Sequence, residues 1–177
     1  MARDWAASAP PQGGWGEKLF RAAINSIQQM SFWPMRVRAR LLGLLGHRLS
    51  RRTYIAAKVE VQGKGLVTAG TVSFNTGCLI DAVAPVTIAD GVRIGCEAMI
   101  VTTTHKVGSP DLRAGRTVHR PVRVGRGSWI GARATILPGV SVAPGCIIAA
   151  GAVVHRSTKP NGLYAGVPAR RVRDLHQ

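Results

Sequence analysis

A repeat of six residues runs from Val124 to Val154 and restricts what this chain can fold into. Its blocks read VGRGSW, IGARAT, ILPGVS, VAPGCI and IAAGAV, so a branched aliphatic residue opens each block and glycine commonly follows. This period fits neither the 3.6-residue repeat of an α-helix nor the alternation of a simple strand. It is typical of a chain that runs as a short strand, turns a corner and runs again. The repeat therefore predicts a solenoid in which three blocks complete one triangular coil.

The same period can be followed upstream, with two interruptions. Aliphatic residues recur, at first weakly, at Ile55, Val61, Val67 and Leu79, and then at Ile88, Ile94 and Ile100. The segment AlaValAlaPro at 82–85 resets the register, which predicts a small bulge at one corner. The segment 105–121 lacks the period and contains Gly108, Pro110 and Gly115, so we expect a loop that leaves the coil. Loops on a rigid scaffold commonly carry function.

Composition agrees with a solenoid. Apolar residues make up 46% of the 177 residues, aromatic residues only 5%, and the chain has 21 glycines and 10 prolines. Such a chain can bury a core of small and branched side chains between many tight corners. The sequence therefore favours one mainly β domain with appendages.

The charge predicts anionic ligands. Lys and Arg number 24 against 8 Asp and Glu, which leaves a formal net charge of +16. Such a surface attracts nucleic acid, anionic membranes or phosphorylated small molecules. No recognition helix, stacking platform or metal knuckle is legible in the sequence, so we expect no direct nucleic-acid binding.

The cysteines and the ends of the chain favour a cytoplasmic protein. Cys78, Cys96 and Cys146 form no CxxC pair, which predicts free thiols in a reducing compartment. We find no signal peptide and no apolar run long enough to span a membrane.

Four segments follow from these patterns. Residues 1–16 form a flexible N-terminal arm, 17–50 a helical cap, 51–158 the β-helix with its loop at 105–121, and 159–177 a basic tail. Within the cap we expect helices over 17–29 and 35–49, of which the second is basic and amphipathic. Two roles fit this helical part: it covers the open end of the solenoid, or residues 17–49 contact an anionic membrane as a peripheral anchor.

Two polar residues stand where the pattern breaks. His105 follows the strand-like IVTTT at the entrance of the loop, where an imidazole suits general-base chemistry near neutral pH. Asn75 interrupts the aliphatic pattern in SerPheAsnThrGly with a group that donates and accepts hydrogen bonds. A solvated loop histidine and a turn asparagine are the alternatives. The remaining histidines are scattered, and no metal site is predicted.

Six ordered segments between about Ile55 and Leu175 resemble the hexapeptide-repeat acyltransferases, and among them the maltose, galactoside and nodulation-type sugar O-acetyltransferases. The segments are FNTG at 74–77, PVTIADGVRIG at 85–95, TTTH at 102–105, PVRVGRGSWIGARATILPGV at 121–140, AAGAVV at 149–154 and AGVPAR at 165–170. The resemblance implies a left-handed parallel β-helix with N-terminal helices and a protruding loop. It also implies a homotrimer with active sites between neighbours.

The resemblance assigns roles to individual residues. His105 matches the family's general base, and Asn75 matches the asparagine that contacts the acceptor and orients the site. Positions that line the acetyl-CoA channel match Gly95, Trp129, Ala132, Ala150 and Gly151. Residues that bind the CoA phosphates correspond to His155, Arg156, Arg170 and Arg173.

The chain departs from these relatives at the acceptor. Ala82 and Val83 replace the aspartates that grip the sugar in the maltose and galactoside enzymes, so Asp81 is the nearby acid left as a substrate-binding candidate. The N-terminal helices differ too. Both departures argue against a simple free disaccharide as the acceptor.

The resemblance implies a metal-free O-acetyltransferase that uses acetyl-CoA as co-substrate. His105 would remove a proton from a hydroxyl of a saccharide or glycosylated metabolite, and the oxygen would attack the thioester directly. The alternatives are N-acylation of an amino sugar or antibiotic on the same scaffold, or a non-catalytic solenoid that binds a partner.

Overall fold

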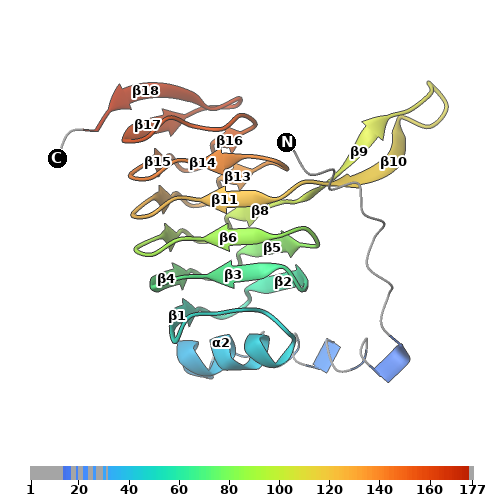
Figure 1. Cartoon of the computed structure of the whole chain (residues 1–177), viewed down its shortest axis with the longest axis vertical. Helices are drawn as coiled ribbons and strands as arrows, with labels where there is room; N and C mark the ends of the chain where they lie inside the picture. The colour runs from blue at the N-terminus through green and yellow to red at the C-terminus, as the bar shows by residue number, and fades with distance from the viewer. Residues whose placement is uncertain are drawn as a thin grey trace, which may run out of the picture.

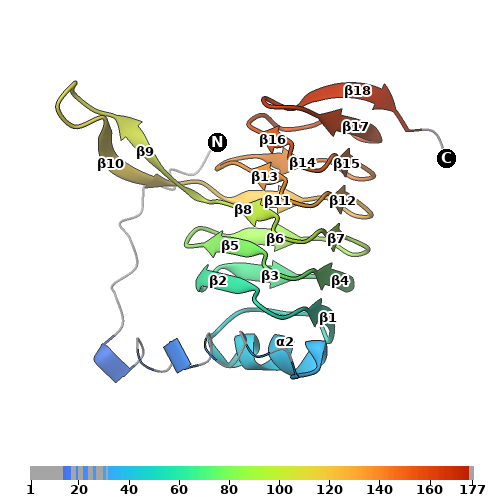
Figure 2. The same cartoon turned by 180° about the vertical axis from the view of Figure 1, so that it is seen from behind.

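The computed structural model describes residues 14–16, 19, 22–23, 26, 30 and 32–175 and shows a parallel β-solenoid of about six turns. Figures 1 and 2 show the turns stacked above a helix at one end. Three sheets form the faces of a triangular prism, which we name the first, second and third face in chain order. The predicted mainly β, parallel solenoid is therefore confirmed.

Successive turns place their strands in register on each face. The first face contains β1 (Arg52–Ile55), β4 (Thr71–Phe74), β7 (Arg93–Ile94), β12 (Trp129–Ile130), β15 (Ile147–Ile148), β17 (Gly162–Ala165) and β18 (Arg170–Asp174). The second contains β2 (Glu60–Gly63), β5 (Leu79–Ala82), β8 (Met99–Ile100), β13 (Thr135–Ile136) and β16 (Val153–Val154). The third contains β3 (Leu66–Thr68), β6 (Val86–Ile88), β11 (Val122–Val124) and β14 (Ser141–Val142).

The six-residue repeat supplies the core. Each two-residue strand buries one residue, which points inward and stacks on its partner in the next turn, as in the column Ile80, Ile100, Ile136 and Val154. Two predicted core positions, Val67 and Leu79, are wrong by one residue. The inward residues are Thr68 and Ile80. The step from Val61 to Thr68 is seven residues long, and because Thr68 is polar, the aliphatic pattern does not reveal it.

The interruption at 105–121 is a β-hairpin and not an irregular loop. Strands β9 (Thr103–Val107) and β10 (Ala114–His119) pair antiparallel, with a register shift between Ala114 and Thr117. The hairpin leaves the prism between β8 and β11, at the edge where the second face meets the third (Figure 1). The solenoid period misses these strands because both sides of the hairpin are largely solvent-exposed and need no inward aliphatic residue.

A helix covers the N-terminal end of the prism. Helix α2 (Met35–Leu44) lies across this end (Figure 2) and buries Arg38, Ala39 and Leu42. It ends five residues earlier than predicted, because Gly46 turns with a φ of +92° and Arg48 then forms a parallel bridge with Val67. Most of the other predicted helix, 17–29, lies outside the described residues. No helix among the described residues is long and apolar enough to cross a membrane.

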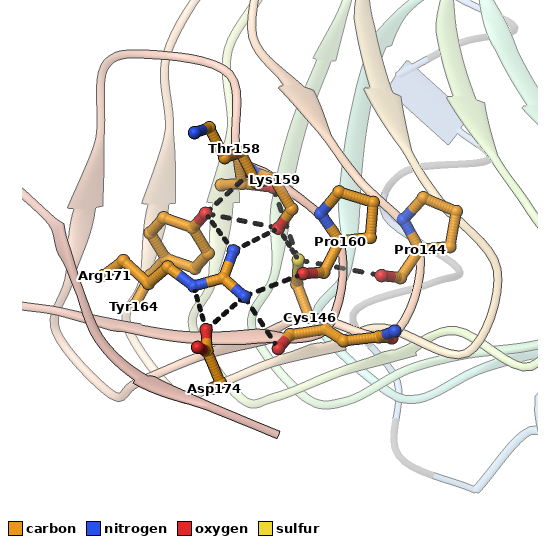
Figure 3. Close-up of polar contacts among 9 residues, drawn as sticks. Pro144, Cys146, Thr158, Lys159, Pro160, Tyr164, Arg171 and Asp174 are labelled. Carbon is orange, nitrogen blue, oxygen red and sulfur yellow. Dashed lines mark hydrogen bonds and ion pairs between the residues drawn. The ribbon is translucent and has the colours of Figure 1, made fainter. Parts of the chain in front are cut away.

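The tail continues the solenoid past the predicted boundary at 158. Strand β17 pairs parallel with β15, and β18 folds back onto β17 antiparallel. Arg171 holds this end: Figure 3 shows its guanidinium donating to the carbonyl oxygens of Lys159 and Pro160 and pairing with Asp174. The guanidinium also donates to the Asn161 carbonyl oxygen at 3.1 Å. It also lies over the ring of Tyr164, at 5.9 Å from the centroid. These backbone contacts explain why the tail does not leave the prism after Pro160.

Candidate functional site

Five of the predicted site residues stack along one edge of the prism, where the first face meets the second. This first–second edge contains Asn75, Gly95, Ala132, Ala150 and Gly151 at the corners of successive turns. Backbone hydrogen bonds connect the corners, including Gly151 N–H to the Ala132 carbonyl at 2.8 Å. The corners are made of small residues, so the edge has a shallow backbone surface along which an extended ligand can lie.

Gly95 is required by this packing. A Cβ atom at this position would lie 2.6 Å from the backbone nitrogen of Ala132 in the next turn. Its own N–H donates to the Ile130 carbonyl at 2.7 Å. Gly95 therefore holds two turns in close contact, in addition to its predicted place in the acetyl-CoA channel.

A pocket of about 730 Å³ opens on the outer side of the first face beside this edge. Asn75, Gly95 and Trp129 line it, so three of the predicted residues share one cavity. The outward residues Ser73, Arg93 and Trp129 stand in register on β4, β7 and β12. Ser73 and Arg93 were not identified as site residues from the sequence. Each directly precedes an inward core residue, and a residue in that place of the repeat faces the outer surface.

Asn75 is exposed at the mouth of the pocket. Its Oδ1 accepts a hydrogen bond from the Thr76 N–H at 2.7 Å, and its backbone N–H donates to the Ile94 carbonyl at 2.9 Å. These two bonds fix the corner and the side chain. The amide NH₂ group is left to donate to a bound molecule.

His105 lies on β9 with an exposed side chain. Its Nδ1 is 2.9 Å from the Gly115 carbonyl oxygen of the same hairpin. Because a carbonyl only accepts, the hydrogen of the neutral imidazole must sit on Nδ1. Nε2 then carries the lone pair, with no partner among the residues that the structure describes. This tautomer is the one a general base needs.

Asp81, predicted to bind substrate, is buried, and its oxygens are occupied. Oδ1 accepts from the Val83 N–H at 3.1 Å and the Thr102 hydroxyl at 3.2 Å, and Oδ2 accepts from the N–H groups of Thr102 and Thr103 at 3.2 and 2.8 Å. With 7% of its surface exposed, Asp81 has no free acceptor for a ligand. It instead anchors the start of the hairpin that carries His105.

Hydrogen bonding sets the charge of Asp81. Burial alone would raise the pKa of this carboxyl, but hydrogen bonds from Thr103, Val83 and Thr102 outweigh burial and lower the pKa below its ordinary value. The base of the hairpin is therefore built around a carboxylate anion.

Within one chain, Asn75 and His105 lie on different edges of the prism. Asn75 lies on the first–second edge, whereas the His105 hairpin leaves the edge between the second and third faces, which we name the second–third edge. His155 and Arg156 follow β16 and also lie on the second–third edge. Asn75 follows β4 of the first face and His105 follows β8 of the second, so the two residues belong to different corners of the coil.

The predicted phosphate contacts are divided between two places. Arg156 is exposed, and Nδ1 of His155 is buried without a hydrogen-bond partner among the described residues. Arg170 and Arg173 are exposed on β18, where Arg170 donates to the Ala169 carbonyl at 3.0 Å. Arg171, between them, has every donor engaged within the chain (Figure 3) and serves the fold.

Within the described ranges, no group of three or more His, Cys, Asp or Glu side chains is arranged to hold a metal ion. Cys78 and Cys146 are buried and Cys96 is exposed, all as free thiols. Burial raises the pKa of Cys78 to about 11, so this thiol stays protonated at neutral pH.

Sequence comparisons show which known proteins this chain resembles. Residues 121–156 match the family model described as bacterial transferase hexapeptide (six repeats). Nodulation protein L of Rhizobium meliloti (strain 1021) is 43% identical over 96 residues, which cover 54% of this chain and 52% of that protein. Galactoside O-acetyltransferase of Escherichia coli (strain K12) is 34% identical over 91 residues, covering 51% and 45%. The chain therefore spans about half the length of these curated relatives.

A solved structure extends the likeness to nearly the whole chain. A hexapeptide-repeat acetyltransferase of Vibrio cholerae O1 biovar eltor, complexed with acetyl-coenzyme A, superposes with a TM-score of 0.80 at 25% identity and covers 92% of this chain and 88% of that one. The resemblance drawn from the sequence is thus confirmed: the chain contains a bacterial-transferase hexapeptide-repeat segment, and its fold is that of the hexapeptide-repeat acetyltransferases.

Proposed function

We propose that this chain is a CoA-dependent O-acetyltransferase that acts on a hydroxyl of a saccharide or glycosylated metabolite, with His105 as general base. The observation that carries the proposal is the hydrogen bond between Nδ1 of His105 and the Gly115 carbonyl. It leaves Nε2 as the proton acceptor on the hairpin. Relatives named nodulation protein L and galactoside O-acetyltransferase support the reaction class.

His105 can carry out the proton transfers that the proposed reaction needs. Nε2 of His105 takes the proton of the acceptor hydroxyl as its oxygen forms a bond to the acetyl carbonyl carbon. The resulting imidazolium returns that proton to the sulfur when the carbon–sulfur bond breaks. Positioned general-base catalysis of this kind contributes roughly 10²–10⁴-fold. No nucleophilic side chain is required, because the acetyl group passes directly to the acceptor.

The first–second edge fits an extended acyl donor. Acetyl-CoA supplies a thioester at one end and phosphate groups at the other. The corner residues Ala132, Ala150 and Gly151 leave the backbone accessible, and an added Cβ at Gly151 would meet no atom within 4 Å. Exposed guanidinium groups at Arg156, Arg170 and Arg173 supply charge-assisted donors for phosphates.

The separation of the two edges supports a homo-oligomer, and the homotrimer that the resemblance implies can supply the required contact. Asn75 and His105 can face one acceptor only if the first–second edge of one chain lies against the second–third edge of its neighbour. A closed ring of three prisms repeats this contact three times by cyclic symmetry. Each site then takes Asn75 from one chain and His105 from the next.

Replacement of the base tests the proposed function. We expect His105→Ala to lower turnover by roughly 10²–10⁴-fold while acetyl-CoA binding stays near the wild-type value. His119→Asn is the matched control on the same hairpin, because it keeps a hydrogen-bonding atom near the Thr103 hydroxyl. Turnover is followed by release of free CoA thiol. Unchanged turnover in His105→Ala contradicts the base assignment, and a hydroxylamine-resistant product would establish N-acylation instead.

A further inference from the structure

Of the described residues, the one charged side chain that lines the pocket on the first face is basic. None of the twelve lining residues is acidic, and Arg93 lies between Ser73 and Trp129 on adjacent strands. The Arg93 side chain is exposed, and no described residue forms an ion pair with it. The pocket therefore contains a positive charge that the described chain does not neutralise.

Neighbouring groups add further donors. Arg36 donates to the Tyr54 hydroxyl oxygen at 2.8 Å and lies over the ring at 5.1 Å, so the Tyr54 O–H is left to donate into the pocket. The amide NH₂ of Asn75 does the same. The nearby acid, Asp90, does not line the pocket: its Oδ1 accepts from the Thr71 N–H at 2.6 Å.

We infer that the acceptor of this enzyme carries an anionic group, a phosphate or a carboxylate, which Arg93 binds while the Trp129 indole packs on the sugar ring, so that Trp129 serves the acceptor in place of the acetyl-CoA channel that the resemblance implied for it. This inference rests on the proposed function, because it takes the pocket beside Asn75 as the acceptor site. A guanidinium matches both oxyanions with two parallel N–H donors. The exposed indole offers the flat apolar surface on which a sugar ring stacks.

Matched probes test the inference by binding. Glucose, glucose 6-phosphate and glucuronic acid are titrated into the CoA-saturated protein by calorimetry at low and high salt. We expect at least one of the anionic probes to bind about 10- to 100-fold more tightly than glucose, because hydrogen bonds to charged groups are the strong ones. The difference should shrink at high salt, since the pocket is open to solvent. Which anionic probe binds more tightly distinguishes phosphate from carboxylate.

Two variants separate this pocket from the general positive charge. Arg93→Leu should abolish the preference for anionic probes, while Arg123→Leu should keep it. Arg123 is an exposed arginine at the matching outward position of β11, on the third face and outside the pocket. The inference is overturned if no probe binds, if charged and neutral probes bind equally, or if both variants lose the preference alike. It is also overturned if Arg93→Leu weakens only acetyl-CoA binding or breaks the oligomer.

The outcomes distinguish this inference from the proposed function. Binding of anionic probes without release of CoA thiol from acetyl-CoA would contradict the transferase but keep the anion site. Turnover confined to neutral acceptors would keep the transferase and refute the role of Arg93.

Discussion

Replacement of Asp81 by asparagine should loosen the base of the hairpin that carries His105. The carboxylate accepts four hydrogen bonds, two at each oxygen, from Val83, Thr102 and Thr103. Asparagine has one carbonyl oxygen, and its NH₂ group cannot accept. With the NH₂ group in the Oδ1 position, the Thr102 hydroxyl can turn to accept from it, so the amide leaves at least one donor, the Val83 N–H, without a partner in a buried position.

The expected cost follows from that donor. An unsatisfied buried donor costs about 1–3 kcal/mol, so Asp81→Asn should lower the free energy of unfolding by about 1–3 kcal/mol. For a chain of this size, this corresponds to a fall in melting temperature of roughly 2–12 °C. Because Thr103 begins β9, we also expect a loss of turnover greater than the loss of folded protein.

Thermal unfolding followed by circular dichroism, with CoA-thiol release below the transition, measures both effects. Asp90→Asn is the control: Asp90 also accepts from a backbone N–H, but its side chain is 47% exposed, so water can replace the lost contact. A change in Asp81→Asn no larger than in Asp90→Asn would refute the anchoring argument.

The pH dependence has a definite sign. The Asp81 pKa is lowered in the folded chain, so the unfolded chain takes up this proton at a higher pH. Its stabilising contribution is complete above the ordinary carboxyl pKa of about 3.9 and is lost as the pH falls through the lower folded value. The melting temperature of the wild type should therefore fall more steeply below about pH 4 than that of Asp81→Asn, and parallel curves would contradict the assignment.

Two further predictions concern the stacked corners and the thiols. Gly95→Ala should destabilise the protein by about 1–3 kcal/mol because its Cβ would overlap the next turn. Gly43→Ala in helix α2 should instead stabilise the protein by about 0.5–1 kcal/mol, since a Cβ there would meet nothing within 4 Å. Equal shifts in melting temperature would contradict the packing argument. At pH 8, an aromatic disulfide reagent should modify the exposed Cys96 rapidly. The buried Cys78, whose pKa is raised, should react only on unfolding. Rapid labelling of a Cys96→Ser variant would disprove the protection of the buried thiols.

The sequence predicts the coil well and the site only in part. The regular blocks after Val124 locate the inward residues, because a buried aliphatic residue in each strand is what the stack requires. The seven-residue step to Thr68 and the exposed hairpin escape the period, since neither places an aliphatic residue inside. The anchoring role of Asp81 depends on contacts with Thr102 and Thr103, which are distant in sequence, and no local motif reveals it.

The distribution of Asn75 and His105 over two edges is the central claim, and a mixing experiment tests it directly. Asn75→Ala and His105→Ala chains are each expected to be inactive, and they are co-expressed in equal amounts with different affinity tags. If each site joins two chains of a closed ring of three, one site in every mixed assembly regains both residues, and CoA-thiol release of purified mixed assemblies recovers to about a third of wild type. Recovery to that level supports the account, and no recovery in verified mixed assemblies contradicts it.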